Sequence, residues 1–82
     1  MYLHLGHSAV VDFRDVVGVF DLDHVTAQRR TRDTLERLEE QERLHVLGHR
    51  LPVSLVVTDQ GAYLSPVSPA VLGRRLAQER WE

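Results

Sequence analysis

The sequence predicts an α+β fold, in which a small and mostly antiparallel β-sheet of about five to six strands packs with one long central helix and a C-terminal helix. Three observations support this prediction. Short β-branched and aromatic runs, separated by glycine-containing turns, occur on both sides of a central stretch that lacks glycine and proline. The length of 82 residues fits one domain, residues 1–82, with a single modest core.

Three strands are predicted in the N-terminal region. Tyr2–Leu5 is a short strand, and the turn Gly6–Ser8 returns the chain into Ala9–Val11 as a hairpin. The third strand contains Val16–Phe20, which is apolar at nearly every position. We expect this strand to be covered on both faces, with the second cover supplied by a neighbouring subunit or by helices that pack on the sheet.

The central stretch Ala27–Leu44 predicts one helix of about 18 residues, because it is dense in Arg, Glu, Gln and Leu. Thr26 can cap this helix with its side-chain hydroxyl. The apolar side is a thin stripe around Leu35 and Leu38. Pairs of opposite charge four residues apart predict helix stabilisation rather than a binding pattern: Arg29 with Asp33, and Glu39 with Arg43.

A hairpin and a helix are predicted in the C-terminal half. The elements follow in the order turn Gly48–Arg50, strand Val53–Thr58, turn Asp59–Gly61 and strand Ala62–Ser65. Ser68 then caps a helix that has Pro69 at its first position and ends at about Gln78. Gly73 weakens this helix by up to about 1 kcal/mol, unless close packing requires a glycine there.

Composition limits the possible functions. The chain has no cysteine, so disulfides, thiol nucleophiles and cysteine-based zinc sites are excluded. We find no basic leader with an apolar stretch and no apolar run long enough to span a membrane, which favours a cytoplasmic protein without a membrane partner. The net charge of −2 is unusual for a nucleic-acid binder, although a local cluster of the ten arginines would suffice to neutralise phosphates.

Histidines are the residues that could suggest a metal site or an active site. His4 lies close in sequence to His7, and His45 lies close to His49. No third ligand, carboxylate cluster or catalytic motif accompanies either pair, so surface or turn histidines are the preferred interpretation. The sequence therefore predicts no enzyme, no metal, no cofactor and no small-molecule substrate.

Specific strings at the two ends of the chain resemble a known family. The opening MYLHLG, the distal VVTDQGAYLSPVSPAVLGRRL, the stretch Arg14–Phe20 and the segment Tyr63–Pro66 are similar to the RemA/RemB family of bacterial extracellular matrix regulators, and closest to its RemB type. The resemblance covers the chain except for roughly 23–47. It implies a ring-shaped homo-oligomer that binds double-stranded DNA on its outer rim and regulates transcription of extracellular matrix, or biofilm, genes.

The resemblance also implies a DNA site, with two departures. RemA-type members carry Gly-Arg-Arg for DNA where this chain has Gly48-His49-Arg50, so Arg50 matches and His49 does not. A solvated arginine beside a turn glycine is the alternative. RemA-type members have Asn-Arg where this chain has Arg14-Asp15, so Arg14 is shifted by one residue and either binds DNA or pairs with Asp15 or Asp12.

Three hypotheses follow. A ring-forming DNA-binding regulator predicts basic residues along one outer rim. An oligomeric scaffold or adaptor of the same fold, with little or no DNA binding, predicts an acidic or neutral rim and is favoured by the net charge, His49 and Asp15. A monomeric ligand-binding or enzymatic domain predicts a cleft with perturbed titratable groups.

Overall fold

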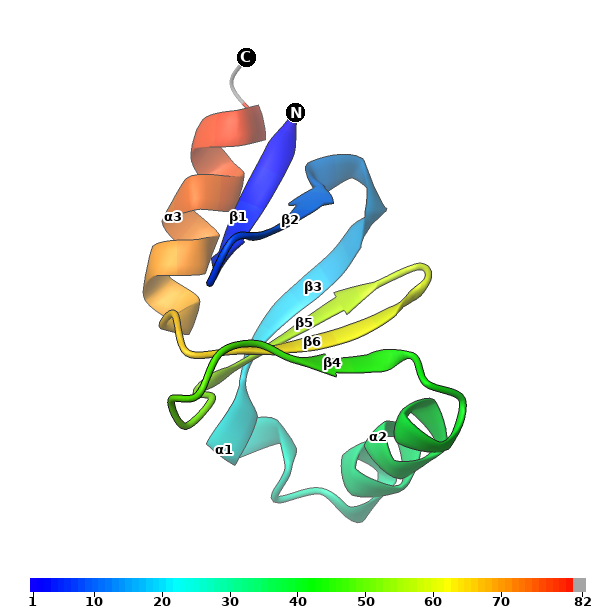
Figure 1. Ribbon diagram of the computed structural model, residues 1–82. Coiled ribbons are helices and arrows are strands. Elements are labelled where there is room, and N and C mark those ends of the chain that lie inside the picture. The colour runs from blue at the N-terminus through cyan, green and yellow to red at the C-terminus, as the bar shows by residue number, and fades with distance from the viewer. Residues whose placement is uncertain (81–82) are drawn as a thin grey trace.

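A computed structural model describes residues 1–80 and shows an α+β domain with two sheets and short helices (Figure 1). The elements are β1 (Tyr2–Gly6), β2 (Ala9–Asp12), the 3-10 turn η1 (Phe13–Asp15), β3 (Val16–Asp21), α1 (Leu22–Val25), α2 (Arg29–Glu40), β4 (Leu44–Val46), β5 (Ser54–Thr58), β6 (Gly61–Ser65) and α3 (Pro69–Arg80). The predicted fold class is confirmed. The strands form a two-stranded and a four-stranded sheet, however, rather than one.

The two-stranded sheet is the predicted N-terminal hairpin. β1 and β2 pair antiparallel, with Leu3 opposite Val11 and a bulge between His4 and Gly6. His7 and Ser8 in the turn both have left-handed backbone conformations, with φ of 50° and 66°. Two left-handed residues give the turn a twist that matches the twist of the flanking strands. The hairpin tip is therefore narrow and places the His7 side chain at its end.

The four-stranded sheet has the order β3-β5-β6-β4. β5 and β6 form the predicted hairpin, and β3 pairs antiparallel with β5. β4 runs parallel to β6, with His45 opposite Tyr63, and this short strand was not predicted. β3 and β4 are thus the two edges of the sheet, where backbone groups have no strand partner on the outer side.

Two glycines of the C-terminal half offer a matched test of this packing. A methyl group on Gly61, the first residue of β6, would collide with the carbonyl oxygen of Arg43, whereas nothing lies within 4 Å of the same position on Gly73 in α3. We expect Gly61→Ala to lower the free energy of unfolding by roughly 1–3 kcal/mol, because backbone must move. Gly73→Ala should instead raise it by up to about 1 kcal/mol, since no packing requires this glycine. Urea denaturation of both variants measures the two shifts, and equal shifts would contradict the packing.

The core lies between the hairpin, one face of the four-stranded sheet and α3. Its buried members are contributed by all three layers: Leu3, Leu5, Val11, Val56 and Leu72. Ser65 is also buried, and its hydroxyl donates to the carbonyl oxygen of Leu5 across a long sequence separation. This bond joins the two sheets, because a buried hydroxyl needs a partner and finds it on the hairpin.

The predicted central helix is wrong at both ends. Thr26 does not cap α2; it ends α1, and its hydroxyl donates to the carbonyl of Leu22 at 2.7 Å. α2 begins after Gln28, whose side chain makes no capping hydrogen bond. It ends at Glu40, because Glu42 takes a left-handed conformation (φ 58°) and turns the chain into β4.

Only one of the two predicted ion pairs of this helix is present. Arg29 and Asp33 lie 3.9 Å apart on the exposed side of α2. Arg43 lies beyond the end of α2, so it cannot form the helical pair with Glu39. Its guanidinium donates instead to the backbone carbonyl of Gln60 at 2.9 Å, which ties the end of this segment to the β5–β6 turn.

β3 is not covered on both faces within one subunit, so the helices do not supply the whole of the expected second cover. Val17 is 70% exposed and Phe20 is 40% exposed. α2 contacts β4 and β6, the two strands farthest from β3 in the sheet. It therefore covers its face of the sheet only in part. Between α2 and β3 remains a hollow of about 380 Å³ whose wall includes Phe20, Leu35 and Leu55.

Candidate nucleic-acid interface

The predicted turn Gly48–Arg50 lies in the loop that joins β4 to β5. Backbone hydrogen bonds fix this loop to β6 at both ends: the N–H of Leu47 donates to Leu64 at 3.0 Å, and the N–H of Val53 donates to Ser65 at 2.9 Å. Gly48 has a φ of 72°, in the left-handed region that favours glycine. The loop is therefore anchored although it lacks secondary structure, and it presents His49 and Arg50 as exposed side chains.

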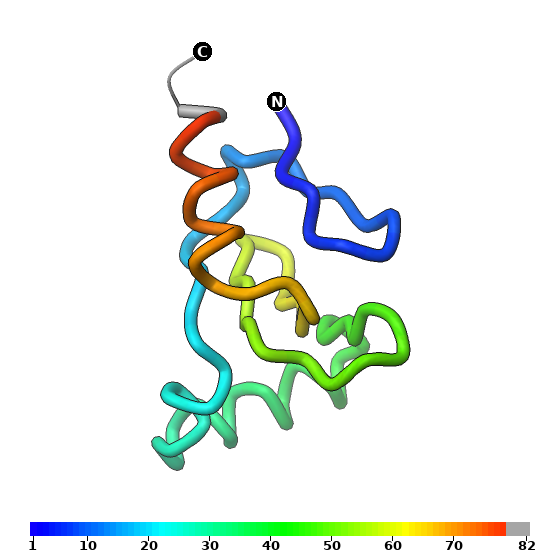
Figure 2. Tube along the Cα trace, turned by 90° about the vertical axis from the view of Figure 1, so that its left-hand side faces the viewer, coloured from blue at the N-terminus to red at the C-terminus, as the bar shows by residue number. Residues whose placement is uncertain are grey.

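The tip of the β1–β2 hairpin meets this loop (Figure 2). The rings of His7 and His49 lie edge to face, with their centroids 6.0 Å apart. A methyl group on Gly48 would lie 3.3 Å from Nδ1 of His7. Neither histidine pairing suggested by sequence proximity forms the contact; two distant segments form it instead.

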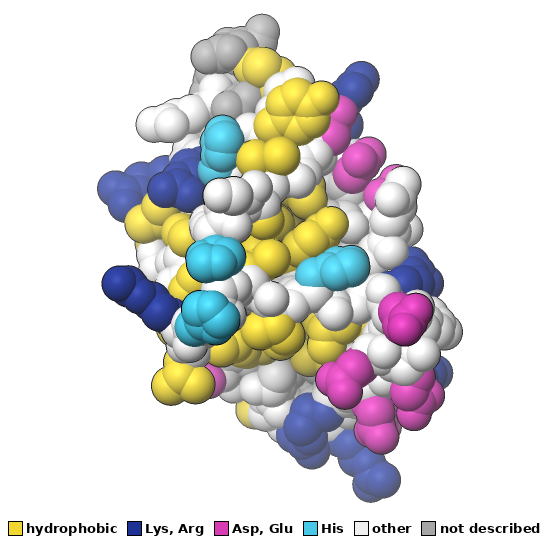
Figure 3. All heavy atoms as spheres, in the orientation of Figure 1, with side chains coloured by type: hydrophobic (Ala, Val, Ile, Leu, Met, Phe, Trp, Pro, Cys, Tyr) yellow, Lys and Arg dark blue, Asp and Glu magenta, His cyan; other side chains and the backbone are white. Residues whose placement is uncertain are grey.

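An open groove of about 470 Å³ lies between the hairpin tip and the β4–β5 loop. Its lining includes no acidic residue: Gly6, His7, Gly48, His49, Arg50, Pro66 and Val67. Figure 3 shows histidine side chains near the middle of this face, arginine side chains at its left edge and most of the acidic side chains on the right. The groove therefore combines one permanent cation with two ionisable imidazoles, a combination that suits an anion.

His45 and His4, the sequence neighbours of the two groove histidines, do not line the groove. The ring of His45 stacks on Tyr63, with the centroids 4.9 Å apart. The backbone carbonyl of His4 accepts a hydrogen bond from Arg75 of α3 at 3.0 Å. This bond fixes Arg75 beside the hairpin, so α3 adds a cation at the middle of β1.

Arg14 lies in η1, at the open end of the hairpin, whereas the groove is at the hairpin tip. Its Nε and Nη2 donate to the two carboxylate oxygens of Asp12 at 3.1 and 2.7 Å. The backbone N–H of Arg14 donates to the same carboxylate at 3.0 Å. Of the alternatives for Arg14, the pairing with Asp12 is thus present in the structure, and Arg14 does not join His49 and Arg50 in one cluster.

Comparison with known proteins identifies a relative along almost the whole chain. The chain is 35% identical over 77 residues to extracellular matrix regulatory protein B of Bacillus subtilis (strain 168), which covers 92% of this chain and 89% of the relative. The chain belongs to the extracellular matrix regulatory protein B family. The predicted resemblance to the RemB type is confirmed, and a match of this extent reaches through residues 23–47, where no signature was recognised. No protein-family model matches.

The ion pair between Arg14 and Asp12 predicts how the stability of this matrix regulatory protein B family member depends on pH. The side-chain hydrogen bonds from Arg14 lower the pKa of Asp12 from 3.8 to about 2, and the same contact raises the pKa of Arg14. A depressed carboxyl pKa means that the pair stabilises the fold above pH 3.8 and loses this contribution as the pH falls through about 2. An NMR titration should show the Asp12 midpoint near 2, moving back toward 3.8 in Arg14→Ala. Equal midpoints in the two proteins would contradict the pairing.

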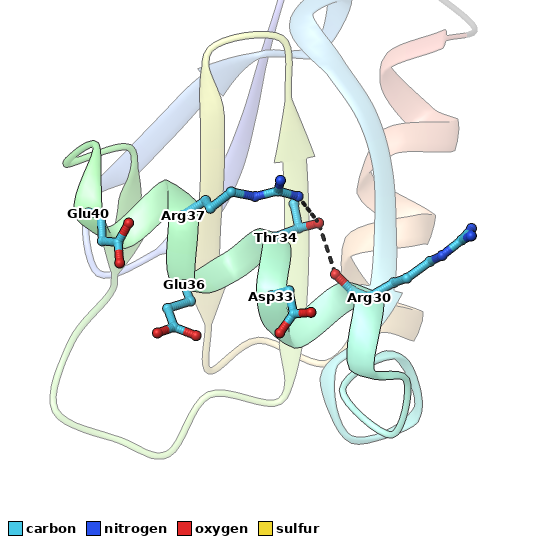
Figure 4. A pocket seen from close by; sticks show the side chains of 6 residues that line it. All are labelled: Arg30, Asp33, Thr34, Glu36, Arg37 and Glu40. Carbon is cyan, nitrogen blue, oxygen red and sulfur yellow. Dashed lines mark hydrogen bonds between the residues drawn. The ribbon is translucent and has the colours of Figure 1, made fainter.

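A second hollow of the matrix regulatory protein B fold lies along the exposed side of α2 and is shown in Figure 4. All its lining residues belong to this one helix, and their charges have both signs: Arg30, Asp33, Thr34, Glu36, Arg37 and Glu40. The Thr34 hydroxyl donates to the carbonyl of Arg30 at 2.9 Å and accepts from Arg37 at 3.4 Å. Cations that alternate with carboxylates make a poor phosphate site, and the contacts seen here, including the predicted Arg29–Asp33 pair, join residues of the same helix.

Residues 1–80 of this protein contain no cluster of metal ligands and no helix that could span a membrane. Within that range, no three or more His, Asp or Glu side chains lie close enough together to hold a metal ion. None of the helices described is long and apolar enough to cross a membrane.

Proposed function

We propose that this protein is a DNA-binding transcriptional regulator of extracellular matrix genes that acts as a ring-shaped homo-oligomer. The observation that carries the proposal is the groove between the hairpin tip and the β4–β5 loop, where Arg50, His49 and His7 meet without an acidic neighbour in the lining. The name of the Bacillus subtilis relative describes a regulatory protein of the extracellular matrix and supports the same role.

The net charge of −2 is compatible with this role because no acidic residue lines the groove. Acidic side chains alternate with arginines along α2, and Asp12 is held by Arg14 at the open end of the hairpin. DNA phosphates respond to local cations, and each contact that displaces a counterion makes the affinity depend on salt. The groove can therefore bind DNA although the whole chain is slightly acidic.

Exposed apolar side chains at both edges of the four-stranded sheet support assembly. Val17 and Phe20 are exposed on β3; at the opposite edge, Val46 of β4 is 61% exposed, and Leu51 in the following loop is 88% exposed. Contact between two different edges is heterologous, and such contacts close into a ring when the rotation between subunits permits it. The resemblance to RemA and RemB implies the same architecture.

A ring would compensate for the small number of cations in one subunit. A single groove with one arginine binds DNA weakly, whereas repeated grooves on a rigid assembly raise the effective concentration of each next contact. Such a regulator acts in the cytoplasm on double-stranded DNA, and the proposal includes no catalytic step, no cofactor and no small-molecule substrate. Target choice would come from DNA bending and site spacing more than from base edges.

The second candidate is an oligomeric scaffold without DNA binding. It is favoured by the contact in which Asp12 neutralises Arg14, because this leaves one fewer cation for phosphate. The groove at the hairpin tip favours the DNA-binding regulator.

The test is to measure the molar mass of the wild-type protein by light scattering and to titrate the same sample with labelled duplex DNA at two salt concentrations. The proposal expects a discrete oligomer whose affinity for DNA falls as the salt concentration rises. A discrete oligomer without DNA binding at low salt would favour the scaffold. A monomer would contradict the ring.

A further inference from the structure

We propose that His7 is a further phosphate-binding residue of this protein and that, together with His49 and Arg50, it makes DNA binding stronger at mildly acidic pH. The inference rests on the proposed DNA-binding function and extends it to a residue on a different element. His49 and Arg50 lie in the β4–β5 loop, whereas His7 is supplied by the tip of the β1–β2 hairpin.

The backbone of the hairpin tip supports a role for the side chain. His7 and Ser8 both adopt left-handed conformations, which non-glycine residues do at a cost and which glycine adopts freely. The ring of His7 nevertheless does not fold into the core: it is exposed and lies edge to face against His49. The turn therefore holds an imidazole at the groove, although glycine would adopt this backbone conformation at a lower energetic cost.

The residues that line the groove around the two imidazoles include one cation, Arg50, and no acidic partner. The β4–β5 loop contributes Arg50 beside His49, and the β6–α3 linker contributes only Pro66 and Val67. On the hairpin side, Gly6 and Ser8 carry no charge, and Arg75 of α3 lies against the carbonyl of His4. An imidazolium in this groove thus has no protein counter-ion there, and an external anion is the group that can stabilise it.

The chemistry of this groove selects a phosphate oxygen rather than a metal ion. A metal needs neutral imidazoles together with further ligands, and no third histidine or carboxylate joins the two within residues 1–80. A phosphate accepts hydrogen bonds from Arg50 at every relevant pH and from both imidazoles when they are protonated. Histidine is in general the side chain whose charge changes between about pH 5 and pH 8, so pH is the variable that tests an imidazole contribution.

The experiment compares the affinity of the oligomer for labelled duplex DNA at about pH 8 and about pH 6, at constant ionic strength and with a chelator present. The first variant is His7→Asn, because asparagine tolerates a left-handed backbone and does not titrate. The second is His7→Arg, which keeps the positive charge at every pH. The control is His24→Asn, since His24 is an exposed histidine on α1, which lies away from the hairpin tip (Figure 2).

For the wild type, we expect affinity to rise on acidification, by roughly fivefold or more for each imidazole that becomes charged. For His7→Asn, the ratio of the DNA affinity at about pH 6 to that at about pH 8 should be at least about threefold smaller than for the wild type. His7→Arg should bind DNA at about pH 8 nearly as tightly as the wild type binds it at about pH 6. His24→Asn should behave like the wild type. Light scattering on each sample confirms that the assembly is unchanged.

The outcomes separate the two proposals. If the wild type binds DNA and His7→Asn keeps the whole pH-dependent gain, the role of His7 is wrong and the DNA-binding function stands. If the wild type binds DNA equally at both pH values, the contribution of the imidazoles is likewise wrong. An oligomer that binds no DNA at either pH overturns the proposed function, and the role of His7 with it.

Discussion

Replacing Arg50 by alanine is expected to lower the affinity for duplex DNA by roughly 10- to 100-fold at low salt, because charged hydrogen bonds of this kind contribute about 1.5–3 kcal/mol. Arg50 is exposed in an anchored loop and forms no ion pair within residues 1–80. Its guanidinium is therefore available to a phosphate without breaking an internal contact. Since no internal contact is lost, the free energy of unfolding should stay within about 0.5 kcal/mol of the wild type.

The measurement is a DNA titration over a series of salt concentrations, with Arg30→Ala as the matched control. Arg30 is also an exposed arginine, but it lies on α2 among carboxylates. In Arg50→Ala, the slope of the logarithm of the DNA affinity against the logarithm of the salt concentration should become shallower by about one for each subunit that contacts DNA. Arg30→Ala should change this slope little. Equal losses in the two variants would indicate a general charge effect and would contradict a specific role of the loop.

Placing a glutamate at Val17 is expected to dissociate the oligomer and to weaken DNA binding by at least about 100-fold, although no arginine is changed. Val17 is 70% exposed at the unpaired edge of β3, so the subunit itself tolerates a polar side chain there. A carboxylate buried between apolar subunit edges would lack a partner and would oppose association. The loss of avidity then removes DNA binding.

Light scattering and circular dichroism on Val17→Glu distinguish dissociation from unfolding. The control is Val10→Glu, because Val10 is 46% exposed on β2, a strand of the separate two-stranded sheet. We expect Val17→Glu to have the mass of a folded monomer and Val10→Glu to keep the mass of the wild type. An unchanged mass for Val17→Glu would show that β3 is not part of the subunit contact.

The elements predicted well from the sequence are those whose signals are local. Both hairpins have turns with glycine at or near the reversal, and the strands of each hairpin pair antiparallel. The C-terminal helix begins at Pro69 as predicted and runs to Arg80. These features depend on residues that are neighbours in the chain.

The elements predicted badly depend on contacts between distant segments. Helix-forming residues continue past Glu40, yet β4 forms there because β6 offers Leu44–Val46 a parallel partner. The contact between His7 and His49 could not be predicted either, since it requires the hairpin tip to reach the β4–β5 loop. For Arg14, the sequence allowed two acidic partners, and the 3-10 turn selects Asp12 by letting its carboxylate accept the backbone N–H of Arg14 as well.

The packing of β1 on α3 has a consequence for synthesis in the cell. Leu3 and Leu5 are synthesised well before Ser65 and Leu72, whose side chains complete their surroundings. The nascent hairpin must therefore wait with an apolar face in water until α3 has been synthesised. We expect truncated products that lack α3 to be candidates for chaperones and proteolysis rather than partly active subunits.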